Sequence, residues 1–266
     1  MSRDSIISLG LLTWFALLAV AEVASAQSGR TQSNGSDARL VTNFGLTAVN
    51  LILSGLVPLA SVTAATVSEQ LGIGLAQRLP LPWLTILALT LGTQSFATYW
   101  LHRLMHKKML LWRVHRVHHA DSEVDVSTSL RNHPLELMLT LPISALVIIV
   151  IGSPISAVVV SQAFLLAATI WQHADIALPR RFDTLLALFF VTPKLHRLHH
   201  SPVRLVHDSN FGELFTIWDR LFGTFKDIEG RSCVGLIDQL ARPDHLLEQL
   251  WSPVQPTAVE HKLDVI

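Results

Sequence analysis

The sequence predicts an all-α integral membrane protein with about four to five transmembrane helices and a helical cap on the cytoplasmic side. Half of its 266 residues are hydrophobic and only 15% are charged, whereas a soluble domain has about 25% charged residues. Several apolar runs also reach the roughly 20 helical residues that cross a hydrocarbon layer of about 30 Å. The net charge is zero, so no basic surface field indicates a nucleic acid partner.

Five apolar runs are the expected membrane spans. They cover residues 6–24, 45–66, 83–101, 135–151 and 155–172. Only Gly152, Ser153 and Pro154 separate the last two runs, which predicts an antiparallel helical hairpin. Residues 182–191 are apolar but too few to cross. We expect them in the membrane interface or beneath the histidine-rich cap.

Basic residues predict the orientation in the membrane, because cytoplasmic loops are enriched in lysine and arginine. Six lie between the third and fourth runs and ten follow the fifth. Both regions are therefore expected on the cytoplasmic side. We assign residues 1–42 to an N-terminal anchor and polar linker, 43–230 to a membrane-embedded domain, and 231–266 to a cytoplasmic tail.

The first run has a second interpretation. Arg3, the apolar stretch and the sequence Ala24-Ser25-Ala26 also match a cleavable secretory signal. Cleavage would move the basic regions to the opposite side of the membrane, against the charge rule. An uncleaved anchor is therefore the preferred interpretation.

Eight of the 13 histidines fall into three clusters with helical spacing. In a helix, residues three and four apart share one face. The clusters are His102 and His106, then His115, His118 and His119, then His196, His199 and His200. Burying so many rings beside a membrane is costly without partners, and a metal ion is a partner for ring nitrogens. A basic helix end would explain Arg116 and Arg197 but not three histidines on one face.

The number of histidines indicates two metal ions, because one histidine-rich site takes about four protein ligands. The near-identical words HRVHH and HRLHH predict that each contributes ligands to both ions. We expect the pair His102 and His106 to divide between the ions. The lone Cys233 excludes an internal disulfide and a cysteine-based site. Imidazole binds zinc, copper, iron and nickel, so spacing alone does not name the metal.

The motifs resemble those of the fatty acid hydroxylase superfamily, also called the sterol desaturase family, of integral-membrane non-haem diiron enzymes. The matching segments are HRLMH at 102–106, HRVHH at 115–119, TPKLHRLHHS at 192–201 and NFGELFTIWDRLFGTF at 210–225. Within the superfamily they are most similar to alkylglycerol monooxygenase and its bacterial relatives. The resemblance implies iron bound by the eight clustered histidines. His173, in WQHAD after the fifth run, matches a further histidine of the family and is the expected ninth ligand.

The resemblance also implies a reaction. Two ferrous ions and O2 as co-substrate would hydroxylate an unactivated C–H bond of a fatty acyl, sterol, hopanoid or ether lipid, in a bacterial inner membrane. The chain contains no flavin or nucleotide glycine fingerprint, so an external reductase, ferredoxin or cytochrome is the expected electron donor. A desaturase with the same diiron centre, and a non-enzymatic membrane protein for metal binding or transport, stay open. Lys107 stands where alkylglycerol monooxygenase has an acid, which leaves the substrate open.

Other polar residues near the motifs are candidates for orienting the ligand rings. These are Asp121, Glu123, Asp125, Asp175, Asp208 and Asn210. His133 precedes Pro134 at the start of the fourth run, and we expect it to cap that helix or orient a neighbour. We assign no site role to His207, or to His245 and His261 in the tail.

Overall fold

The computed structural model of this chain describes residues 3–24, 36–56, 60–228, 233–236 and 244–255. Within these residues, all regular secondary-structure elements are helices, and Phe190 and Phe215 form one isolated β-bridge. The all-α prediction is confirmed. The possible cleavage site after Ala26, most of the predicted linker and His261 lie outside the described residues.

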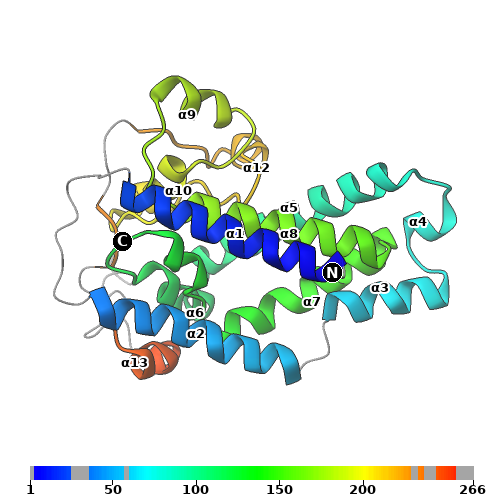
Figure 1. Ribbon diagram of the computed structural model, residues 1–266, viewed down its shortest axis with the longest axis horizontal. Coiled ribbons are helices and arrows are strands. Elements are labelled where there is room, and N and C mark those ends of the chain that lie inside the picture. Colours follow the sequence, from blue (N-terminus) through cyan, green and yellow to red (C-terminus); the bar gives the residue numbers. More distant parts are fainter. Residues whose placement is uncertain (1–2, 25–35, 57–59, 229–232, 237–243, 256–266) are drawn as a thin grey trace.

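Besides α2 (Ser36–Leu56), which is described below, four long helices form a bundle, and short helices gather at one end of it (Figure 1). The long helices are α1 (Arg3–Ala24), α5 (Trp83–Lys107), α7 (Pro134–Ile151) and α8 (Ile155–His173). The short elements at the common end include α6 (Met109–His119), η1 (Val126–Leu130), α9 (Arg180–Leu186), α10 (Pro193–His199), α11 (Arg204–His207) and α12 (Ile217–Leu221). This end is the cap that carries the histidines.

Three described helices are long and apolar enough to cross a membrane: Ser5–Ala24, Pro134–Ile151 and Ile155–His173. A fourth crossing can come from the segments Ala60–Arg78 and Trp83–Lys107, which are bent by 100°. Large apolar side chains on the long helices, such as Leu12 and Phe164, are exposed, as expected where lipid replaces water. The prediction of an integral membrane helical protein is therefore confirmed.

The expected span at 45–66 is wrong. Its described residues divide between α2 (Ser36–Leu56) and α3 (Ala60–Leu71). Helix α2 is not a candidate span, and α3 belongs to one only as part of the bent pair with α5. The physical reason is the polar face of α2, which binds to the cap. Thr47 Oγ1 donates to the carbonyl of Leu130 at 2.8 Å, and Asn50 Nδ2 donates to that of Asn132 at 2.8 Å.

The predicted turn between α7 and α8 is confirmed, but the two helices do not pack closely on each other, because α7 packs on α3 and α5 and α8 packs on α5 and α10. Gly152 ends α7 in the left-handed conformation, with φ of 73°, and Pro154 precedes α8. Gly74, just before α4 (Leu75–Arg78), has φ of 103° and lies against the Gly152 backbone. A Cβ atom at Gly74 would lie 2.4 Å from the Gly152 Cα atom. The two turns can approach this closely only because both residues are glycine.

We therefore expect Gly74→Ala to destabilise the protein by about 1–3 kcal/mol, because it adds both backbone strain and a clash between two main chains. Thermal unfolding of the detergent-purified protein measures this effect. Gly92→Ala in α5 is the matched control, since a Cβ atom there would have no neighbour within 4 Å. Equal unfolding temperatures for the two variants would contradict the proposed close contact.

The C-terminal segment packs on the cap. Helix α13 (Leu246–Trp251) contacts α2, and η2 (Ser252–Val254) contacts α6. Arg116, which is fully buried on α6, donates from Nε to Ser252 Oγ at 2.9 Å. On the other side of the cap, α9 exposes Phe182 and Leu185, and Phe189 follows it, also exposed. This short apolar element fits the expected place in the membrane interface, and the domain boundaries stay a prediction.

Candidate metal centre

The nine candidate ligands come from four helices that meet in the cap. His102 and His106 lie in the last two turns of α5, and His173 is the last residue of α8. Helix α6 carries His115, His118 and His119, and α10 carries His196 and His199, with His200 directly after it. All except His102 are buried, so the structure brings together every histidine that the sequence analysis selected.

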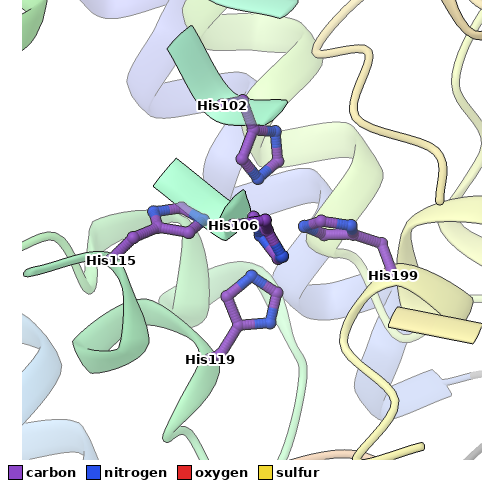
Figure 2. Close-up of side chains that lie close together, drawn as sticks. All are labelled: His102, His106, His115, His119 and His199. Atoms are coloured by element: carbon purple, nitrogen blue, oxygen red, sulfur yellow. The ribbon is translucent and has the colours of Figure 1, made fainter. Parts of the chain in front are cut away.

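The nine rings form two groups, each compact enough to surround one ion. The first group contains His102, His106, His115, His119 and His199, drawn in Figure 2, and the second contains His118, His173, His196 and His200. In each group, one nitrogen atom per ring lies within 4.8 Å of all the others. The groups are adjacent, because the rings of His119 and His200 stack with centroids 4.5 Å apart.

The motifs HRVHH and HRLHH each contribute rings to both groups, as the sequence predicts. His102 and His106, however, are not divided between the groups. Both belong to the first group, so that expectation is wrong. Residues four apart are offset by only about 40° around a helix, whereas residues three apart are offset by about 60° in the other direction. The structure accordingly keeps every pair with a spacing of four in one group. The middle histidine of each motif, His118 or His199, belongs to the other group.

Hydrogen bonds from the protein fix the orientation of five rings. Four rings have Nδ1 next to a main-chain carbonyl oxygen: His102 at 2.9 Å from Phe211, His118 at 3.1 Å from Arg131, His173 at 2.7 Å from Thr169, and His199 at 2.8 Å from Ser209. His115 Nδ1 lies 3.1 Å from Glu136 Oε1. These oxygens only accept, so Nδ1 carries the proton and Nε2 keeps its lone pair for a metal.

The free nitrogen atoms fit metal ligation. His102, His115 and His199 each have a buried Nε2, and His106 and His119 have both ring nitrogens buried, without a hydrogen-bond partner in the described chain. In the second group, His173 Nε2 lies 3.0 Å from His118 Nε2 and 2.9 Å from His196 Nε2. Orphaned buried nitrogens that converge in this way are costly unless a cation binds them.

Burial favours the neutral form of five of the rings, which is the form that binds metal. In the cap, burial lowers the pKa of five histidines well below the usual value, and neighbouring imidazoles lower it further. These are His118, His119, His196, His199 and His200. The residues therefore fit two ions held by neutral nitrogen donors.

The side chains expected to orient the rings mostly have other partners. Asp208 Oδ1 lies 3.5 Å from His106 Nδ1. Asp175 binds Arg197 at 2.7 Å, and Asn210 donates to the carbonyl of Leu195. The sequence analysis missed Glu136, although its place three residues after His133, in the first turn of α7, was a signal that could have been used.

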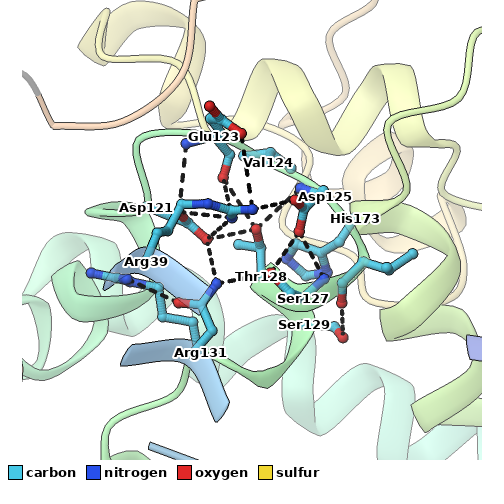
Figure 3. Close-up of polar contacts among 12 residues, drawn as sticks. Arg39, Asp121, Glu123, Val124, Asp125, Ser127, Thr128, Ser129, Arg131 and His173 are labelled. Atoms are coloured by element: carbon cyan, nitrogen blue, oxygen red, sulfur yellow. Dashed lines mark hydrogen bonds and ion pairs between the residues drawn. The ribbon is translucent and has the colours of Figure 1, made fainter. Parts of the chain in front are cut away.

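Asp121, Glu123 and Asp125 belong instead to a buried network around Arg39 of α2 (Figure 3). Arg39 Nη1 lies 3.1 Å from Asp121 Oδ2, and Arg39 Nη2 pairs with Asp125. Although burial acts in the opposite direction, Arg39 lowers the pKa of Asp125 below its usual value. Asp125 in turn caps η1 by accepting from Ser127 N at 2.8 Å.

A second residue of α2 extends this network to a candidate ligand. Asn43 Nδ2 donates to Asp121 Oδ2 at 3.0 Å, and Asn43 Oδ1 accepts from Arg131 Nη1 at 2.9 Å. The carbonyl of Arg131 is the acceptor for His118. Helix α2 is thus connected to His118 of the second histidine group through Asn43 and Arg131.

Two further histidines lie near the centre. His133 caps α7, because its Nδ1 accepts from Leu135 N at 3.1 Å, and this confirms the capping interpretation. The His207 ring lies 4.6 Å from that of His106, and burial lowers the pKa of His207 to about 4. The sequence analysis gave His207 no role, but it can form a small third group with His106 and Asp208.

A cavity of about 400 Å³ opens from the histidines into the helical bundle. His102, His118 and His173 line one end, and α5, α7 and α8 form its walls. Leu141, Leu166, Gln94, Ser144 and Val147 also line it, at helix positions further from the cap. A ligand in this cavity would place one part beside the histidines and another between apolar helices.

We expect Glu136→Leu to weaken metal binding by the first group about 10- to 100-fold, because the orienting partner of a ligand has that effect. His115 would lose its acceptor. Competition with a coloured chelator measures the affinity. Glu69→Leu, at an exposed position of α3, is the control and should leave affinity unchanged. Unchanged affinity in Glu136→Leu would contradict the orienting role.

Comparison with known proteins identifies the family. The family model described as fatty acid hydroxylase matches residues 87–224, which is a little over half of the chain and contains all nine histidines. The chain belongs to the fatty acid hydroxylase family. It is thus a member of a family of oxidoreductases, and the resemblance seen in the motifs is confirmed.

This chain has curated relatives in bacteria and animals. It is 29% identical over 174 residues to ornithine lipid hydroxylase of Rhizobium tropici, covering 62% of this chain and 51% of the relative. It is 32% identical over 158 residues to human alkylglycerol monooxygenase, covering 58% and 33%, and 27% identical over 150 residues to human lathosterol oxidase, covering 53% and 46%. The aligned part thus spans about half or less of each relative. No solved structure matches this chain.

Proposed function

We propose that this protein is a membrane-bound, non-haem diiron oxygenase that uses O2 to hydroxylate an unactivated C–H bond of a lipid. The observation that carries the proposal is the pair of adjacent histidine groups at a cavity between membrane helices. Fatty acyl, sterol, hopanoid and ether lipids are the candidate substrate classes. The relatives named for acting on ornithine lipids and alkylglycerols support a lipid substrate.

The protein's own residues would hold and orient the reacting groups. The first group would bind one iron and the second group the other, with main-chain oxygens and Glu136 fixing the ring orientations. When bound, the iron pair supplies the O2 activation that C–H oxidation requires. Leu141, Leu165 and Leu166 line the cavity and would keep bulk water away from the reacting carbon.

The membrane setting would supply both the substrate and the remaining partners. A lipid could enter between the exposed apolar helices while its polar group stays near the cap. Electrons would come from an external reductase, ferredoxin or cytochrome. We place the protein in a bacterial inner membrane with the cap on the cytoplasmic side, following the distribution of basic residues.

The test combines metal analysis with an oxygen-isotope experiment. The detergent-purified protein should contain two iron ions per chain. Cells that express it under 18O2 should accumulate a lipid that has gained one labelled oxygen atom, and cells that express His199→Ala should not. A lipid that has instead lost two hydrogens would assign the desaturase reaction. Bound zinc together with an unchanged lipid profile would contradict the oxygenase proposal.

A further inference from the structure

Glu213 places a carboxyl group on the cavity wall next to the histidine groups. The two residues before it are held by Asp219, whose carboxylate accepts from Phe211 N and Gly212 N, both at 2.8 Å. Glu213 Oε1 accepts from Thr169 Oγ1 at 2.8 Å. The carbonyl of the same Thr169 is the acceptor for His173. Thr169 thus connects the Glu213 carboxyl group to a candidate ligand through two hydrogen bonds.

Two other residues on the same wall each have a buried side-chain oxygen that accepts no hydrogen bond in the described structure. Gln172, which is only 4% exposed, has a buried Oε1 without a partner in the described residues. Glu136 bonds to His115 through Oε1, and its buried Oε2 is likewise unpartnered there. Both residues line the cavity. An unsatisfied buried acceptor costs about 1–3 kcal/mol, which indicates that a ligand supplies the missing donors.

The polar groups further along the cavity do not show this deficit. Gln94 Nε2 donates to Ser144 Oγ at 3.2 Å, and Ser161 Oγ donates to Gln94 Oε1 at 3.1 Å. The hydroxyls of Ser61 and Ser144 also lie 3.3 Å apart. These side chains satisfy one another between helices, as polar groups do in membrane bundles. The need for donors is therefore confined to the end of the cavity beside the histidines.

Hydrogen bonding limits the kind of group that can bind there. The described lining contains the carboxyl groups of Glu136 and Glu213 and no lysine or arginine. Burial raises the pKa of Glu213, whereas hydrogen bonds from Thr169 and Thr98 lower it. A free fatty acid carboxylate or a phosphate would bring only further acceptors to a wall where acceptors already lack donors. A hydroxyl or an amine would bring the donors that are missing.

We propose that Glu213, Gln172 and the free oxygen of Glu136 form an acceptor cluster that binds a hydroxyl or amine of the lipid substrate. The substrates would then be lipids with a free hydroxyl or amine close to the oxidised carbon, rather than plain acyl chains or fatty acids oxidised far from their head group. This inference takes one assumption from the proposed function, namely that oxidation takes place at the histidine end of the cavity. The lipid tail would extend along α5 toward Gln94, about 12 Å from His102 at 1.5 Å per residue.

The test measures binding, so it does not depend on turnover. Two matched lipid pairs are the probes: an alkylglycerol and its dimethyl ether, and an amino lipid and its N-acetyl derivative. Native mass spectrometry gives dissociation constants for the detergent-purified protein. The wild type should bind at least one uncapped lipid about tenfold or more tightly than its capped partner, as expected for donors that satisfy buried acceptors.

Variants assign the discrimination to the cluster and separate its two possible ligands. Glu213→Leu and Gln172→Leu should bring the capped and uncapped lipids of a pair to similar affinities. Glu213→Gln should retain hydroxyl discrimination, because its amide oxygen still accepts, but it should lose amine discrimination, which needs the carboxylate. Gln70→Leu is the control. It makes the same change at an exposed position of α3 that does not line the cavity, and it should bind like the wild type.

Three results would overturn the inference. The wild type could bind capped and uncapped lipids equally, or Glu213→Leu could keep the wild-type ratio. Glu213→Leu could also lose bound metal while it keeps the ratio, which would assign Glu213 to the ions instead. Discrimination without any oxygenated product would leave the acceptor cluster intact and refute the oxygenase proposal.

Discussion

Replacing His119 with alanine should abolish lipid oxygenation and remove metal from the first histidine group. His119 is buried at the meeting point of the two groups, and both of its ring nitrogens lack a hydrogen-bond partner in the described structure. Even an outer partner of a ligand contributes about 10- to 100-fold to metal affinity, so the loss of a ligand should exceed that range. Metal analysis and the lipid product, measured on the same preparation, test the expectation.

His245→Ala is the matched control for this experiment. His245 is an exposed histidine that precedes α13, outside both groups. We expect wild-type metal content and activity from it. If His119→Ala retained two ions per chain, the assignment of the first group as a metal site would fail.

The second large effect is expected from Arg39→Met, which should destabilise the protein by about 3–5 kcal/mol. That is the usual effect of leaving buried charges without their partner. The Arg39 side chain is 3% exposed, and those of its partners Asp121 and Asp125 are 0% and 9% exposed. Methionine has a similar length but cannot balance the two carboxylates. Thermal unfolding in detergent measures the change.

Lys194→Met provides the comparison. Lys194 forms an ion pair with Asp227 in which both side chains are 32% exposed, and such pairs contribute about 0–1 kcal/mol. The two variants remove the same kind of charge at different depths. Similar unfolding temperatures would show that the Arg39 network does not hold the cap together.

The sequence predicted correctly those helices whose formation depends on residues within a single segment of the chain. The apolar runs in α1, α7 and α8, and the Gly152 turn between the last two, follow from hydrophobicity and glycine alone. The prediction was wrong for 45–66, because hydrophobicity cannot show that Asn43, Thr47 and Asn50 form bonds to a loop more than 70 residues away. Such a partnership depends on tertiary contacts that a local pattern does not contain.

The candidate site could likewise be predicted only in part. Helical spacing was enough to select eight of the nine histidines, because spacing determines which rings share a face; the ninth, His173, was selected by the resemblance to the family. It was not enough to sort them into groups, as His102 and His106 show, since that depends on how α5, α6 and α10 pack. Nor did the sequence reveal Gln172 and Glu213 as neighbours on one wall, because they come from different segments that meet only in the folded chain.

The ring orientations depend largely on atoms that mutation does not remove. Four of the five orienting bonds described above end on the peptide oxygens of Phe211, Arg131, Thr169 and Ser209. Every amino acid supplies such an oxygen, so these positions can change their side chains during evolution and keep the ring geometry, provided the backbone path is preserved. The side chains around the cavity are then free to diversify for new lipids without disturbing the geometry on which the chemistry depends.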